Sequence, residues 1–142
     1  MGLVNSIENV MNYALGLELD SAYDVTPLKK AIKTQSSETI FSLVKELQKK
    51  IKKISLFQKR QEQLTALGVA ILKALPDIEK SSNAKGLGLG LIFGATGNKK
   101  LLESKDEKCD SKYPKCVKRA LKQIDSCLLQ LKNNDKETNT KK

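Results

Sequence analysis

Apolar residues recur at helical spacing through the middle of the chain. From Ser37 onward they follow steps of four and three residues, which is the spacing of a coiled-coil seam. The first members of this seam are Ile40, Val44, Leu47, Ile51 and Ile54. The pattern shifts by three residues at Phe57, and Pro76 ends it. Between these two points the seam continues through Gln61, Leu64, Gly68, Ile71 and Leu75.

This seam predicts one long central helix over residues 37–75, about 57 Å long at 1.5 Å per residue. A break at Ser55, which would turn the segment into a hairpin of two helices, is the alternative. Because Gln61 and Gly68 interrupt the seam, a bundle helix is favoured over a free coiled coil. Seam surface left uncovered within the chain would pair two copies as a homodimer.

Three further segments show helical periodicity. The first begins at a cap at Asn5 or Ser6 and stops between Leu17 and Asp20; the second opens at Thr26-Pro27. A C-terminal helix from Pro114 is expected to pack along the long helix. The apolar positions of these segments are, in order, Ile7, Val10, Met11, Ala14 and Leu15; Leu28, Ala31 and Ile32; and Val117, Leu121, Ile124, Leu128 and Leu131. The sequence therefore predicts an all-α bundle of four to five helices in one domain, 1–134, with a disordered polar tail, 135–142.

A glycine-rich apolar stretch follows the polar segment 77–85. Three of its glycines are spaced four apart, so a helix would align them as a bare stripe for close packing. We interpret the stretch first as a packed short helix or buried loop, and second as a contact for a partner or for lipid. It lacks the Gly-Lys-[Ser/Thr] of a phosphate-binding loop. The residues of the candidate contact are Gly86, Gly90, Gly94, Leu87, Leu91 and Phe93.

Charge adds a second candidate surface. The 142 residues carry 26 basic and 16 acidic side chains, a net charge of +10, and every basic residue except Arg60 and Arg119 is a lysine. Lysine binds phosphates as a point charge but does not read base edges as arginine does. A solvated helix face is the simplest interpretation, and contact with anionic lipid or phosphate is the next. The candidate basic surface is Lys29, Lys30, Lys33, Lys45, Lys49, Lys52, Lys53, Lys59 and Arg60.

The first residues, Met-Gly-Leu-Val-Asn-Ser, fit the N-myristoylation pattern and make Gly2 a lipidation candidate. A short pattern of this kind also arises by chance. A single acyl chain gives only marginal membrane affinity and needs a second signal, which the basic surface would supply. The start of the chain lacks a signal-peptide pattern, and we expect a cytoplasmic protein that is peripheral to a membrane.

The sequence offers no set of residues for catalysis. Histidine is absent, and the three cysteines, Cys109, Cys116 and Cys127, match neither a disulfide framework nor a zinc site. We therefore expect no enzyme, no cofactor and no metal. The first hypothesis is a non-enzymatic helical interaction protein with a protein partner, which works either as an adaptor or at an anionic membrane surface. A sequence-independent nucleic-acid binder is the second, and a membrane-active protein that inserts residues 64–97 is the third.

Overall fold

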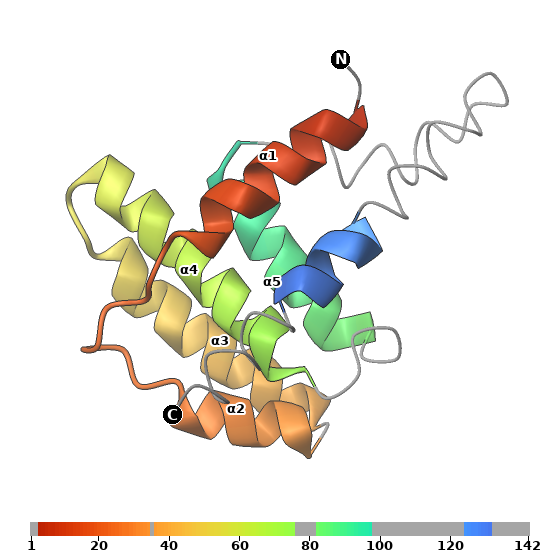
Figure 1. The fold of residues 1–142 in the computed structure, drawn as a ribbon. Coiled ribbons are helices and arrows are strands. Elements are labelled where there is room, and N and C mark those ends of the chain that lie inside the picture. Colours follow the sequence, from red (N-terminus) through yellow and green to blue (C-terminus); the bar gives the residue numbers. More distant parts are fainter. Residues whose placement is uncertain (1–2, 35, 76–81, 98–123, 132–142) are drawn as a thin grey trace, which may run out of the picture.

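The computed structural model describes residues 3–34, 36–75, 82–97 and 124–131, and these residues form six helices and no strand (Figure 1). The all-helical fold class is thus confirmed, but the described residues alone form six helices instead of the four to five predicted. The helices are α1 (Leu3–Leu15), α2 (Thr26–Lys33), α3 (Ser37–Lys52), α4 (Phe57–Ala74), α5 (Ser82–Ala95) and a last helix over residues 124–131. The tail 135–142 and the cysteines at 109 and 116 lie outside the described residues.

The single long helix predicted over 37–75 is wrong, and the hairpin alternative is what forms. The chain leaves helical geometry after Lys53 and re-enters it through Leu56, whose ψ of 115° is extended. A compact domain of this length has a radius of gyration of about 14 Å, so it could not cover a continuous helix of about 57 Å. Breaking the helix at the shift in the seam lets both halves turn apolar faces toward one core.

The seam of α3 is buried within the single chain. Ile40, Val44, Leu47 and Ile51 are all at most 7% exposed, and α3 packs against α2, α4 and α5. Ile54, the last predicted member, is half-buried at the break. The seam of α3 therefore leaves no apolar surface exposed that a second copy could cover.

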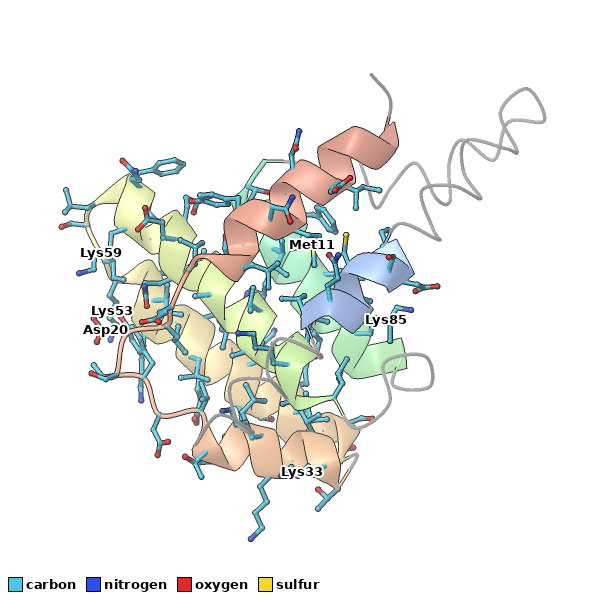
Figure 2. The ribbon with its side chains drawn as sticks, in the orientation of Figure 1. Met11, Asp20, Lys33, Lys53, Lys59 and Lys85 are labelled. Carbon is cyan, nitrogen blue, oxygen red and sulfur yellow. The ribbon has the colours of Figure 1, made fainter. Side chains whose placement is uncertain are left out.

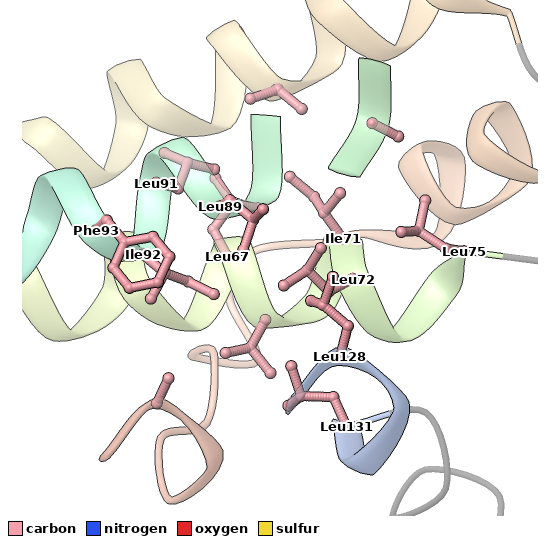
Figure 3. Packing of buried hydrophobic residues seen from close by; sticks show 14 of the residues in the cluster. Leu67, Ile71, Leu72, Leu75, Leu89, Leu91, Ile92, Phe93, Leu128 and Leu131 are labelled. Carbon is pink, nitrogen blue, oxygen red and sulfur yellow. The ribbon is translucent and has the colours of Figure 1, made fainter. Parts of the chain in front are cut away.

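The sequence predicted that the last helix packs along α3, and this prediction is wrong. Figure 3 shows Leu128 beside Leu72, Leu131 on the same side of α4, and α4 between this helix and α3. An ion pair of 3.3 Å between Lys85 Nζ and Asp125 Oδ1 also joins the helix to α5. Ile124 is buried as the spacing predicts, whereas Val117 and Leu121 lie outside the described residues.

The shorter helices follow the predicted apolar faces. Ile7, Val10, Met11 and Ala14 of α1 are buried, but α1 begins at Leu3, before the predicted cap, and ends at Leu15. On α2, Leu28, Ala31 and Ile32 are buried as expected. Thr26 is the first residue of α2 and not its cap. The amide and hydroxyl of Thr26 donate hydrogen bonds to the Asp24 carboxylate, and these bonds lower the pKa of Asp24.

Helices α4 and α5 form the centre of the core, and their contact is the most extensive of any pair among α1–α5 (Figure 3). Their backbones meet at two glycines. A Cβ added at Gly68 would lie 2.6 Å from the carbonyl oxygen of Gly88, and one added at Gly88 would lie 2.9 Å from Leu72 Cδ2. Only residues without a side chain allow this approach. The described side chains that line the interface include Leu67, Ile71, Leu72, Leu89, Ile92 and Phe93.

Gln63 holds the connection between α1 and α2 onto α4. Its side chain is 8% exposed, its Oε1 accepts a hydrogen bond from the Asp20 amide at 2.7 Å, and its Nε2 donates to the Glu18 carbonyl at 3.2 Å. Among the described residues, no buried side-chain nitrogen or oxygen lacks a partner. The buried amide therefore replaces water for two backbone groups of the connection.

Replacing Gln63 by alanine is expected to lower the free energy of unfolding by about 1–3 kcal/mol, because it leaves the Asp20 amide and the Glu18 carbonyl without their partner. Urea denaturation followed by circular dichroism measures the change. Gln58→Ala is the control, since Gln58 is exposed and makes only a 3.5 Å bond to Glu62. It should change stability by less than about 0.5 kcal/mol. Equal losses for the two variants would contradict the role given to Gln63.

Candidate functional site

The turn between α3 and α4 gathers positive charge at one end of the molecule. We call Lys49, Lys50, Lys52, Lys53, Lys59 and Arg60 the basic end. All five lysines are exposed, and Figure 2 shows Lys53 and Lys59 at the same end of the fold. No carboxylate lies between Glu46 and Glu62 in the sequence. The α3–α4 turn thus carries several cations and no acidic residue of its own, and Figure 2 places one acid from another segment, Asp20, beside Lys53.

Two large apolar side chains sit at the centre of the basic end. We call Leu56 and Phe57 the hairpin tip; they are 69% and 65% exposed, the highest values among the exposed large hydrophobic residues described. Scattered single hydrophobic residues on a surface need no explanation, but neighbouring ones mark a contact site more often. Burying a side chain of this kind is worth about 1.5–3 kcal/mol relative to full exposure.

The backbone around the hairpin tip is held by a set of hydrogen bonds. The amide of Ile54 donates to the Ile51 carbonyl at 3.0 Å, and the amide of Arg60 donates to the Leu56 carbonyl at 2.9 Å. Arg60 Nη1 donates to the Ile54 carbonyl at 3.0 Å, a cation placed near the end of α3 where the helix dipole favours it. The same guanidinium lies 5.4 Å from the centre of the Phe57 ring. The tip is therefore positioned by its own helix ends.

The remaining predicted basic residues do not join this group. Lys29, Lys30 and Lys33 are exposed on α2, and Figure 2 places Lys33 at a different edge of the molecule from Lys53. Lys29, Lys30 and Lys33 belong to α2, whereas the lysines of the basic end begin in the last turn of α3. Lys45 lies between the two groups, with its Nζ 4.7 Å from the centre of the Phe41 ring. The predicted surface is thus divided, and its parts act separately beyond a Debye length of about 8 Å.

The glycine stretch forms α5, and its packing differs from the predicted stripe. Gly86, Gly90 and Gly94 have open space where a Cβ would lie, so they do not make the close contact. Gly88, outside the predicted stripe, makes it with Gly68. Leu91 and Phe93 are 8% and 0% exposed, and Leu87 is half-buried. A partner or lipid cannot reach Leu91 or Phe93 while α5 stays in place.

An open groove of about 590 Å³ lies beside the hairpin tip, between α1, α4 and the end of α5. Phe57 and the half-exposed Tyr13 both line it. Gln61 closes part of its floor by donating from Nε2 to the Ala95 carbonyl at 2.6 Å. The other lining residues are Asn9, Val10, Gln58, Thr65 and Thr96. The only titratable group on this list is the Tyr13 hydroxyl, so the groove holds no acid–base pair.

The described residues offer no cluster of three or more His, Cys, Asp or Glu side chains that could hold a metal ion. Within the same residues, none of the helices combines the length and apolarity needed to cross a bilayer. Gly2 lies outside them, so its acylation stays a prediction. Cys127 is 3% exposed.

No family model, curated protein or solved structure matches the chain.

Sequence reasoning missed three residues of this site: Lys50, Leu56 and Phe57, the last of which was placed on the seam. A signal for them was present, since the shift in the seam falls between two runs of cations. In a continuous helix, the three-residue shift of the seam would leave Phe57 on the buried face. Because the helix breaks at the shift, Leu56 and Phe57 are exposed instead.

Proposed function

We propose that this chain is a non-enzymatic interaction protein that binds anionic membrane surfaces through its basic end. The observation that carries the proposal is the basic end, where six cations surround two exposed apolar side chains with no carboxylate between Glu46 and Glu62. The bilayer is the partner because it offers both complementary groups at one surface: negative headgroups for the lysines and an apolar interior for the tip.

The acidic residues near the basic end are Asp20, Glu46 and Glu62, and Figure 2 places Asp20 beside Lys53. None of the three belongs to the segment between the end of α3 and Phe57. Glu62 lies more than one turn along α4 from Phe57, and Asp20 is tied through its amide to Gln63, about 9 Å further along α4 than Phe57. Each Lys or Arg near an anionic surface contributes about 1 kcal/mol, and the contribution falls off within a Debye length. The six cations of the basic end are close enough together to act on one patch of membrane.

A nucleic acid would be attracted by the same lysines, but it fits the tip less well. Binding to single strands uses aromatic side chains on which successive bases stack, and recognition of duplexes draws heavily on arginine. The basic end has one aromatic ring and one arginine, and Leu56 has no partner in such a complex. The insertion of residues 64–97 as a hairpin is also disfavoured, since their apolar side chains form the core.

Flotation of the purified protein with vesicles tests the proposal. Vesicles of phosphatidylcholine with added phosphatidylserine should carry the protein upward, and the bound fraction should fall as salt is raised. Vesicles of phosphatidylcholine alone should leave most of it at the bottom of the gradient. No flotation with phosphatidylserine at low salt, or equal flotation with the neutral vesicles, would refute an anionic membrane as the partner.

A further inference from the structure

The hairpin tip differs from every other exposed apolar position in the described residues. Tyr13, Phe41 and Leu129 are 50%, 45% and 51% exposed, but they lie singly on α1, on α3 and on the helix of residues 124–131. Leu56 and Phe57 are consecutive and occupy the turn where two helices end. If the α3–α4 turn approaches a partner surface end-on, Leu56 and Phe57 touch that surface before the sides of the helices do.

We propose that Leu56 and Phe57 insert into the interfacial region of the bilayer as a two-residue wedge, and that this wedge orients the α3–α4 hairpin toward the membrane. The inference rests on the proposed function, because it requires an anionic bilayer as the partner. The wedge adds to that function a defined depth of insertion and a defined orientation of the protein on the membrane. It also adds an apolar contribution to the binding free energy, which salt does not screen. Apolar faces of peripheral proteins sit about 5–10 Å into the boundary between headgroups and acyl chains.

The charges around the wedge match this placement. Lys52 and Lys53 come before the tip and Lys59 and Arg60 come after it, each within four residues of Leu56 or Phe57. Long lysine and arginine stems can extend along the protein so that the charged ends stay at the headgroups while apolar neighbours go deeper. The cations would thus meet lipid phosphates at the level where the wedge enters.

Three backbone groups of the turn are already hydrogen-bonded, whereas Leu56 gives the first turn of α4 no side-chain cap. An unpaired amide or carbonyl is costly away from water, and such groups bar irregular backbone from the bilayer core. Here the Ile54 carbonyl is bonded to Arg60 Nη1, the Ile54 amide to Ile51, and the Leu56 carbonyl to the Arg60 amide. Partial insertion of the tip therefore leaves these three backbone groups with their partners.

The groove beside the tip would bring a second aromatic residue toward the surface. Tyr13 lines the groove with Phe57, is 50% exposed and belongs to α1. Tyrosine is favoured at the headgroup level, where its ring meets apolar groups and its hydroxyl stays wet. The expected order of depth is therefore Phe57 below Tyr13.

Tryptophan fluorescence tests the wedge, because the chain has no tryptophan of its own. Phe57→Trp places the only reporter at the tip, and Phe41→Trp places it on an exposed position of α3 as the matched control. With phosphatidylserine-containing vesicles, the Phe57→Trp emission should shift to the blue and be quenched by lipids brominated on their acyl chains. The Phe41→Trp emission should stay unshifted and unquenched.

The outcomes separate the wedge from the proposed function. Unshifted Phe57→Trp emission in a protein that still floats with the vesicles would overturn the wedge and leave electrostatic binding intact. Failure to float would overturn both. Equal quenching of the two reporters would overturn the orientation.

A second variant removes the wedge. Leu56→Ser/Phe57→Ser should keep the wild-type stability, since both side chains are exposed, and should lower vesicle affinity roughly a hundredfold. The remaining binding should be fully lost at raised salt, whereas the wild type should keep a salt-resistant part. An unchanged affinity would overturn the wedge.

Discussion

Gly68→Ala is expected to lower the free energy of unfolding by about 2–3 kcal/mol, although alanine favours helix over glycine by about 1 kcal/mol. The new Cβ would lie 2.6 Å from the Gly88 carbonyl oxygen, 2.8 Å from Ile92 Cγ1 and 3.1 Å from Leu91 Cβ. The first of these is a backbone atom in the opposite helix, so relief requires α4 and α5 to separate. That separation loosens the largest helix contact in the described fold. Urea denaturation followed by circular dichroism measures the loss.

Gly90→Ala is the matched control, because both substitutions add one methyl group to a helical glycine. Gly90 has open space at its Cβ position, so the variant gains helix propensity and should be more stable by about 0.5–1 kcal/mol. Opposite signs for the two variants are the expected result. A loss of stability in Gly90→Ala equal to that in Gly68→Ala would mean that the stripe of Gly86, Gly90 and Gly94 is packed after all.

Neutralising the lysines at the end of α3 should lower the affinity for phosphatidylserine-containing vesicles roughly a thousandfold. The variant replaces Lys49, Lys50, Lys52 and Lys53 by glutamine, and each charge near an anionic surface is worth about 1 kcal/mol. All four side chains are exposed, so the fold should be retained, with only the small loss that removing cations from a helix C-terminus brings. A titration with vesicles, followed by sedimentation, measures the affinity.

A second lysine variant separates position from net charge. Replacing Lys29, Lys30 and Lys33 by glutamine removes nearly as much charge from α2, and Figure 2 places Lys33 at a different edge of the molecule from Lys53 and Lys59. This variant should lose less than about tenfold in affinity, since its lysines lie on a different helix from the hairpin tip and screening by salt weakens charges that are set back from the contact. If the two variants lost the same affinity for each lysine removed, the basic end would have no special role.

Apolar spacing predicted most of the helical fold. The faces built on Ile7, Leu28, Ile40 and Leu128 are buried as expected, because a helix in a small domain must turn its apolar side inward. The spacing did not decide between a long helix and a hairpin. Both arrangements bury the same residues of α3, and the choice depends on whether the rest of the chain can cover the full length.

Helix partners were harder to predict than helices. The last helix and α3 have the same spacing of apolar residues, which suggested a pair, yet Leu128 and Leu131 pack against α4. A seam specifies that a face will be buried but not which neighbour buries it, since any apolar face of similar width is complementary. Tertiary contacts of this kind are set by chain connections and by the space left between helices.

The glycines show the same limit at a single position. Regular spacing drew attention to Gly86, Gly90 and Gly94, whereas the close approach uses Gly88 and a glycine twenty residues earlier, Gly68. One glycine on each of two helices carries no periodic signal. For the same reason, the exposure of Leu56 and Phe57 followed only once the break between α3 and α4 was placed.

The most direct test of the central claim is a competition between membrane and nucleic acid for the wild-type protein. Phosphatidylserine-containing vesicles and duplex RNA are mixed with the protein at equal concentrations of negative charge, and the vesicles are floated. The basic end alone would bind either polyanion, but the hairpin tip gains only from the bilayer, so the protein should float with the vesicles. Protein that stays at the bottom with the RNA, and floats only when RNA is omitted, would contradict the membrane as the partner of this surface.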